Sequence, residues 1–141
     1  RAGLRELLKQ GAHDSDWVLV HDAARCLVTP VQINALIDAC QDDAVGGLLA
    51  HKLADTLKTE TQGRVAQTVD RSDKWLAQTP QMFRYGLLCE ALEKSQAVTD
   101  EAGAVEALGH SPKLVRGDTT NLKVTYPADL ALAGLILRGR K

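Results

Sequence analysis

The stretch VLVHDAARCLVTP, residues 18–30, decides the fold class, because a buried strand and the start of a helix meet in it. Val18–Val20 is an apolar, partly β-branched run that favours a short buried strand. Thr29 and Pro30 are typical of a helix start, and apolar residues follow at helical spacing over 33–40. A strand and a helix therefore follow one another closely.

A second buried strand is expected at 44–50, where Gly46 and Gly47 permit close approach of another backbone. The order strand, helix, strand predicts a βαβ unit, with parallel strand pairing and a right-handed crossover. The fold class is therefore α/β.

The remaining pattern predicts further elements around this unit. They are a helix ending at Gly11, a helix carrying Leu87–Leu92 after 78–81, a helix with Thr99 as its N-cap, strands at 113–115 and 121–124, and a closing helix with Pro127 in its first turn. No repeat or linker interrupts them, so residues 1–141 are expected to form a single domain.

Residues 55–59 and 64–69 alternate between polar and apolar side chains on either side of 60–63, which predicts a β-hairpin. The βαβ layer offers this hairpin no obvious partner strand. Because an isolated hairpin is only marginally stable in water, we expect it to lean on another surface, such as a second subunit.

Composition excludes several classes of function. The chain has a net charge of −1 and 4% aromatic residues, so we expect no nucleic-acid partner. The longest apolar stretch, 130–137, is far shorter than the ~20 residues of a membrane span, and no signal peptide is recognisable, so no membrane association is expected. Three widely spaced cysteines without a CxxC motif indicate reduced thiols in the cytoplasm.

The first candidate site residues are Asp22 and Arg25, because ligands of open α/β sheets bind beyond the carboxyl ends of the strands. The small Ala23 and Ala24 leave room beside them for a metal ion or a phosphate group. The alternative is that Asp22 only caps the turn and Arg25 is a surface charge. Local sequence alone favours that alternative.

Other polar residues have two interpretations as well. Lys123 is either an edge-strand charge or a phosphate-binding charge. The segment 99–101 is a helix start that could also bind an anion. Thr56 and Arg71, on and just past the hairpin, are by themselves solvated polar positions.

Six short motifs nevertheless occur in an order and spacing that resemble one family. They are HDAAR (21–25), DTLK (55–58), TVDR (68–71), QTPQ (78–81), TDEA (99–102) and NLKVT (121–125). From about Trp17 onward the chain resembles the 2-C-methyl-D-erythritol 4-phosphate cytidylyltransferases of non-mevalonate isoprenoid biosynthesis. For residues within the motifs, the resemblance favours a functional role over the structural role that local sequence alone favours.

The resemblance implies a Rossmann-like nucleotidyltransferase fold with a protruding β-hairpin dimerisation arm at about 53–70. Residues 1–141 would be a partial nucleotidyltransferase domain. It further implies transfer of CMP from CTP to 2-C-methyl-D-erythritol 4-phosphate, release of pyrophosphate, a requirement for Mg²⁺, and a homodimer whose arm reaches the neighbouring active site.

The resemblance also assigns roles to individual residues. Lys123 and Asp22 would be catalytic, Asp22 would also contact the metal, and Ala23 would lie against the nucleotide. The implied substrate-binding residues are Asp22, Arg25, Thr56, Arg71, Thr99 and Lys123.

Two departures from the family pattern involve uncharged positions, and we expect both to be tolerated. Cys26 stands where proline is common, and Gly103 stands where serine is common. The glycine-rich nucleotide loop of the family is expected N-terminal to Arg1, so the 141 residues alone are expected to be inactive. The alternatives are a cytidylyltransferase for another polyol phosphate, such as ribitol 5-phosphate, and a non-catalytic module that dimerises through the arm.

Overall fold

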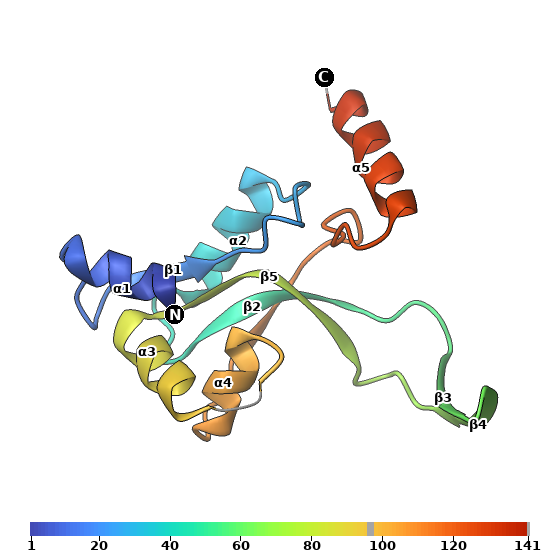
Figure 1. Cartoon of the computed structure of the whole chain (residues 1–141), viewed down its shortest axis with the longest axis horizontal. Coiled ribbons are helices and arrows are strands. Elements are labelled where there is room, and N and C mark those ends of the chain that lie inside the picture. Colours follow the sequence, from blue (N-terminus) through green and yellow to red (C-terminus); the bar gives the residue numbers. More distant parts are fainter. Residues whose placement is uncertain (96–97, 141) are drawn as a thin grey trace.

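A four-stranded mixed sheet forms the centre of the computed structural model, which describes residues 1–95 and 98–140 (Figure 1). Its strands, in spatial order, are β1 (Trp17–Val20), β5 (Trp75–Arg84), β2 (Gly46–Lys52) and β6 (Lys113–Arg116). β5 is antiparallel to both β1 and β2, whereas β6 is parallel to β2. The α/β class is confirmed.

The expected direct pairing of β1 with β2 is wrong. The two strands run in the same direction, and α2 (Pro30–Cys40) connects them in sequence, but β5 lies between them. Residues 78–81 belong to this ten-residue strand, which was not among the predicted elements. Polar side chains do not normally indicate a buried strand. Gln78, Thr79 and Gln81 are buried here because each makes a hydrogen bond to a residue far away in the sequence.

Helices cover both faces of the sheet (Figure 1). α3 (Tyr85–Lys94) and α4 (Glu101–Ala107) pack on the face that carries Leu48 and Phe83. α2 packs on the opposite face, against Leu49 and Met82. The two cores follow from strand geometry, because adjacent residues of a strand point to opposite faces.

The glycine pair at the start of β2 allows close strand contact, as predicted. Gly46 has a φ of 106°, and a Cβ added there would lie 2.1 Å from the Met82 carbonyl oxygen. A Cβ on Gly47 would lie 2.4 Å from the Lys113 carbonyl oxygen. Both positions therefore require glycine if β2 is to remain between β5 and β6.

The helix termini confirm most of the predicted boundaries. α1 (Ala2–Lys9) ends before Gly11, and Thr29 caps α2 through a capping box with Gln32. The N-cap predicted at Thr99 is wrong: the cap of α4 is Asp100, whose carboxylate accepts a hydrogen bond from the Gly103 N–H at 2.9 Å. An aspartate carboxylate is the better acceptor at such a position.

The predicted hairpin is confirmed as a separate two-stranded sheet of β3 (Leu57–Thr61) and β4 (Arg64–Val69). It projects away from the central sheet (Figure 1). Gln62 and Gly63 form the turn with φ angles of 52° and 75°. Most of its side chains are exposed.

The strand predicted at 121–124 is wrong. These residues form an irregular segment between β6 and α5 (Pro127–Gly139). The segment is held from outside the sheet: the Val124 N–H donates to the Ala24 carbonyl at 2.9 Å, and Asn121 is fully buried. Within the described ranges, no helix has the length and apolar character that a bilayer crossing needs.

Candidate active site

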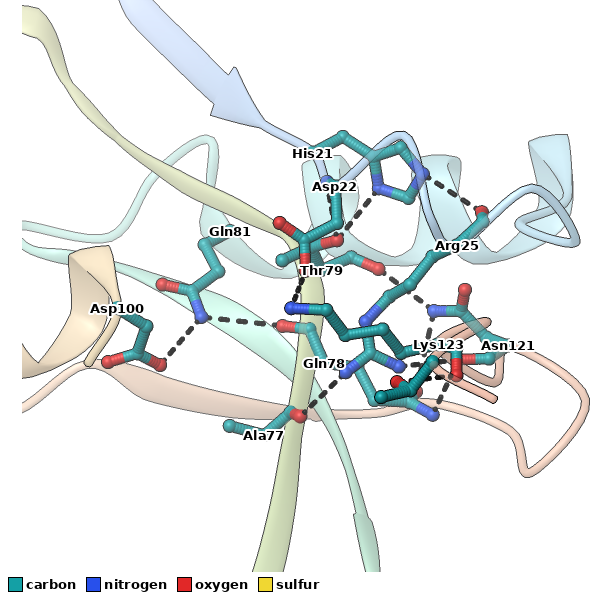
Figure 2. Close-up of polar contacts among 11 residues, drawn as sticks. His21, Asp22, Arg25, Ala77, Gln78, Thr79, Gln81, Asp100, Asn121 and Lys123 are labelled. Carbon is teal, nitrogen blue, oxygen red and sulfur yellow. Dashed lines mark hydrogen bonds and ion pairs between the residues drawn. The ribbon is translucent and has the colours of Figure 1, made fainter. Parts of the chain in front are cut away.

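A pocket of about 330 Å³ lies where the turn after β1, the middle of β5, the start of α4 and the segment 121–125 meet (Figure 2). Its lining residues are Asp22, Arg25, Ala77, Gln78, Thr79, Gln81, Thr99, Asp100, Glu101 and Lys123. Four of the six family-like motifs thus meet at one pocket.

An ion pair closes one side of this pocket. Lys123 Nζ lies 2.9 Å from Asp22 Oδ2, and the two side chains are 53% and 39% exposed. Both charged groups remain accessible, so an incoming anion can take the place of the carboxylate beside the lysine. The arrangement brings together the two residues for which the sequence suggested catalysis.

Arg25 joins two segments of the backbone beside the ion pair. Its Nη1 donates to the Asn121 carbonyl at 2.7 Å, and its Nη2 donates to the Ala77 carbonyl at 3.3 Å. Burial lowers the pKa of the Arg25 guanidinium, while the nearby Asp22 carboxylate raises it. An arginine still remains a cation, and its Nε lies buried without a hydrogen-bond partner.

Two buried amides fix the segment around residue 121 against β5. Gln78 Nε2 donates to the carbonyls of Asp118 and Asn121, at 2.9 and 3.2 Å. In return, Asn121 Nδ2 donates to the Thr79 carbonyl at 2.8 Å. Because buried polar groups of this kind are costly to leave unpaired, these bonds hold the loop that carries Lys123.

A third buried amide fixes the start of α4. Gln81 Nε2 donates to Asp100 Oδ2 at 2.9 Å, and its Oε1 accepts from the Ala102 N–H at 2.8 Å. Thr99 precedes this anchored helix start and lies at the pocket. Thr99 is thus an exposed residue directly before an anchored helix start.

The turn between β1 and α2 has its own anchor. Thr79 Oγ1 accepts a hydrogen bond from the Asp22 N–H at 3.0 Å and lies 3.0 Å from His21 Nδ1. The other ring nitrogen of His21 lies 3.1 Å from the Arg25 carbonyl oxygen. The turn that carries Asp22 and Arg25 is thus attached to the central strand (Figure 2).

The structure brings together some of the predicted site residues and not others. Asp22, Arg25, Thr99 and Lys123 line the pocket. Ala23 is exposed on the adjoining turn, outside the lining set. Sequence reasoning missed His21, Gln78, Thr79, Gln81 and Asn121; the signal was the run of polar residues leading into the apolar Met82–Phe83.

Thr56 and Arg71 do not line this pocket. Both are exposed residues at the base of the hairpin. Arg71 Nη1 donates to the Leu53 carbonyl at 2.8 Å and also to the Ala54 carbonyl. These bonds close the base of the hairpin and fix the direction in which it leaves the sheet.

A model of the 2-C-methyl-D-erythritol 4-phosphate cytidylyltransferase (IspD) family matches residues 2–139. The bifunctional enzyme IspD/IspF of Albidiferax ferrireducens is 63% identical over 139 residues, covering 98% of this chain and 33% of that protein. The 2-C-methyl-D-erythritol 4-phosphate cytidylyltransferase of Dechloromonas aromatica is 63% identical over 131 residues, covering 92% of this chain and 58% of that protein. The chain thus spans less than two thirds of either relative.

Solved structures share the fold. A 4-diphosphocytidyl-2C-methyl-D-erythritol synthase superposes with a TM-score of 0.92 at 47% identity, covering 96% of this chain and 64% of that one. The 2-C-methyl-D-erythritol 4-phosphate cytidylyltransferase of Thermus thermophilus superposes with a TM-score of 0.84 at 33% identity, covering 97% and 68%. The mixed sheet with its helices is therefore a nucleotidyltransferase fold. Sequence, family model and fold agree, and the chain belongs to the 2-C-methyl-D-erythritol 4-phosphate cytidylyltransferase family.

Proposed function

We propose that the full-length protein transfers CMP from CTP to 2-C-methyl-D-erythritol 4-phosphate, giving CDP-methylerythritol and pyrophosphate for isoprenoid synthesis. The observation that carries this proposal is the accessible Lys123–Asp22 pair beside Arg25, at a pocket where four family motifs meet. Membership of the family supplies the identity of the two substrates.

The reaction requires little covalent chemistry from the protein. A phosphate oxygen of methylerythritol phosphate attacks the α-phosphorus of CTP and forms the new P–O bond. The bond between the α-phosphorus and the bridging oxygen breaks, and pyrophosphate leaves with the electron pair. The nucleophile is already ionised at neutral pH, so positioning and positive charge supply most of the catalysis.

Four residues of the pocket, and Ala23 beside it, have roles in this reaction. The Lys123 ammonium moves from Asp22 to the phosphate oxygens and stabilises the charge that develops on them. Arg25 adds a fixed guanidinium beside them. Thr99 donates its hydroxyl to the substrate, Asp22 contacts the polyol and the metal, and the backbone at Ala23 lies against the nucleotide.

Nucleotidyltransferases of this family usually depend on a divalent metal, and we propose Mg²⁺ with Asp22 as its protein ligand. Among residues 1–95 and 98–140, no three His, Cys, Asp or Glu side chains gather as a metal cage. That arrangement fits Mg²⁺, which is commonly held by one or two carboxylates together with substrate phosphates and water. When bound, the ion would neutralise phosphate charge.

The substrate assay tests the function directly. Purified full-length protein is given CTP with methylerythritol phosphate or, in parallel, with ribitol 5-phosphate, and pyrophosphate release and the CDP product are measured. We expect clear preference for methylerythritol phosphate. Preference for ribitol 5-phosphate would reassign the substrate, and absence of transfer to both would leave the non-catalytic alternative.

We further propose that the protein is a cytoplasmic homodimer in which Thr56 and Arg71 of one arm serve the partner's pocket. The support is that both residues are exposed at the base of a projecting hairpin and outside the pocket of their own chain. Its three cysteines are free thiols, which suits a reducing compartment.

Subunit mixing tests the arm. Arg71→Ala and Asp22→Ala each damage both sites of their own homodimer. In a mixed dimer, one site combines the pocket of the Arg71→Ala subunit with the arm of the Asp22→Ala subunit, and this site carries neither substitution. With random pairing, half of the dimers are mixed and each has one intact site of two, so we expect co-expressed full-length variants to recover about a quarter of the wild-type CMP transfer. Mixed dimers without recovered activity would show that the arm does not work in trans.

A further inference from the structure

The turn 21–25 carries both Asp22 and Arg25 to the pocket, and His21 stands at its beginning. The turn has one internal backbone hydrogen bond, from the Arg25 N–H to the Asp22 carbonyl at 2.9 Å. His21 adds a second link across the turn, because its Nε2 lies 3.1 Å from the Arg25 carbonyl oxygen. Its Nδ1 links the turn to β5 through Thr79. Figure 2 shows both contacts of the ring.

The partners of the ring determine where its proton lies. A carbonyl oxygen only accepts, so Nε2 must carry the proton that is shared with the Arg25 carbonyl. In the neutral ring, Nδ1 is then an acceptor, and the Thr79 hydroxyl donates to it. Thr79 Oγ1 itself accepts from the Asp22 N–H at 3.0 Å. The result is one directed chain, from the Asp22 N–H through Thr79 and His21 to the Arg25 carbonyl.

His21 borders a second pocket, which adjoins the candidate active site at Glu101. It borders a mostly apolar pocket of about 510 Å³ together with residues of α1, β1 and α3, including Leu88 and Leu92. Asp22 and Arg25 line the 330 Å³ pocket of the candidate active site, and His21 does not. With both ring nitrogens engaged by Thr79 and the Arg25 carbonyl, His21 is poorly placed for proton transfer to a substrate.

We propose that His21 is a positioning residue, which locks the turn 21–25 through its Nε2–H tautomer and thereby aims Asp22 and Arg25 into the pocket. Loss of the ring removes the acceptor of the Thr79 hydroxyl and the donor to the Arg25 carbonyl at the same time. The two side chains then keep their chemistry but lose their fixed orientation. The kinetic part of this inference rests on the proposed cytidylyl transfer, whereas the tautomer does not.

The first test is ¹⁵N NMR of histidine-labelled full-length protein, with the His21 signals assigned from their absence in His21→Leu. We expect a protonated Nε2 and an unprotonated Nδ1. In Thr79→Val, the Nδ1 resonance should shift, because the hydroxyl donor is gone. A proton on Nδ1, or an unchanged Nδ1 resonance in Thr79→Val, would overturn the inference, whether or not the protein transfers CMP.

The second test separates positioning from general stability. His21→Leu removes both hydrogen bonds, His21→Asn retains an acceptor near Nδ1, and His21→Gln retains a donor near Nε2. We expect His21→Leu to lower kcat of CMP transfer about tenfold to a hundredfold, with the KM for CTP unchanged. Asn and Gln should each recover part of that loss.

The matched control is His110→Leu, because His110 is an exposed histidine between α4 and β6, outside the candidate active site. We expect this variant to retain the wild-type kcat. Unchanged kcat in His21→Leu, or equal impairment of the Leu, Asn and Gln variants, would overturn the positioning role. If wild-type protein transfers no CMP, the proposed function fails, and the NMR experiment still decides the tautomer.

Discussion

Two lysine–aspartate ion pairs of nearly equal length occupy very different surroundings. Lys123 and Asp22 lie 2.9 Å apart at the pocket, and Lys113 and Asp43 lie 3.0 Å apart beside the start of β2. The Asp43 side chain is 23% exposed, and that of Asp22 is 39% exposed. The distance between the charges therefore does not distinguish the two pairs.

Backbone hydrogen bonds make the difference. Asp43 Oδ1 accepts from the N–H groups of Val45 and Gly46, at 2.9 and 3.0 Å. The hydrogen bonds from Gly46 and Val45, together with Lys113, lower the pKa of Asp43 to about 2. The Asp43 carboxylate thus holds a turn through backbone hydrogen bonds. The Asp22 carboxylate is paired with the accessible Lys123 ammonium, which we propose binds a ligand instead. The same charges serve structure in one place and, we propose, chemistry in the other.

The largest effect expected from the two carboxylates is on activity. In the full-length protein, Asp22→Asn should lower the rate of CMP transfer about a hundredfold, because it removes the carboxylate that we propose contacts the metal and the polyol. Asp43→Asn should stay within about twofold of wild type, since its oxygen can still accept from the backbone. Steady-state kinetics at neutral pH measure both, and equal losses would abolish the distinction.

Acid unfolding should show a smaller effect at Asp43. Its folded-state pKa of about 2 lies below the ordinary value of 3.8, so its ionised form favours folding. That contribution is present above about pH 4 and is lost as the pH falls through about 2. Asp43→Asn should flatten this part of the curve of unfolding free energy against pH.

Urea unfolding at several acidic pH values measures that curve. The control is Gly3→Ala, at a helical position where an added Cβ meets nothing within 4 Å. This change should move the whole curve without altering its slope, because it involves no titrating group. An Asp43→Asn curve parallel to wild type would contradict the structural role of Asp43.

The smallest expected effect is on stability at neutral pH. Both lysines are close to half exposed, at 45% for Lys113 and 53% for Lys123. Exposed ion pairs contribute little, so Lys113→Ala should cost about 0.5–1 kcal/mol of unfolding free energy and Lys123→Ala less than about 0.5. A larger loss of unfolding free energy in Lys123→Ala than in Lys113→Ala would indicate that the Lys123–Asp22 pair is structural.

Much of the fold could be predicted from local pattern. Helical spacing located α2, α3 and the closing helix, the glycine pair marked β2, and alternation marked the hairpin. β5 was not predicted, because its polar residues do not follow the apolar pattern of a buried strand. Only the hydrogen bonds of Gln78 and Gln81 to distant segments make burial of those side chains favourable.

Some residues of the candidate site could be predicted from the sequence, and others could not. Asp22, Arg25, Thr99 and Lys123 were predicted because they stand in motifs, and the structure brings them to one pocket. The residues that hold them, such as Asn121 and His21, were missed because their role depends on partners far away in sequence. The strand expected around Lys123 failed for the same reason: its backbone is bound by Ala24 rather than by a neighbouring strand.

The lysines of the two pairs provide the most direct test of the central claim, which is that the pocket beside Lys123 is the place of cytidylyl transfer. The measurement compares kcat/KM for methylerythritol phosphate between full-length Lys113→Ala and Lys123→Ala, in one buffer and at saturating CTP. We predict a ratio of about a thousand, because Lys123 lines the proposed site of transfer and Lys113 does not. A ratio near one, with both variants folded, would contradict the claim.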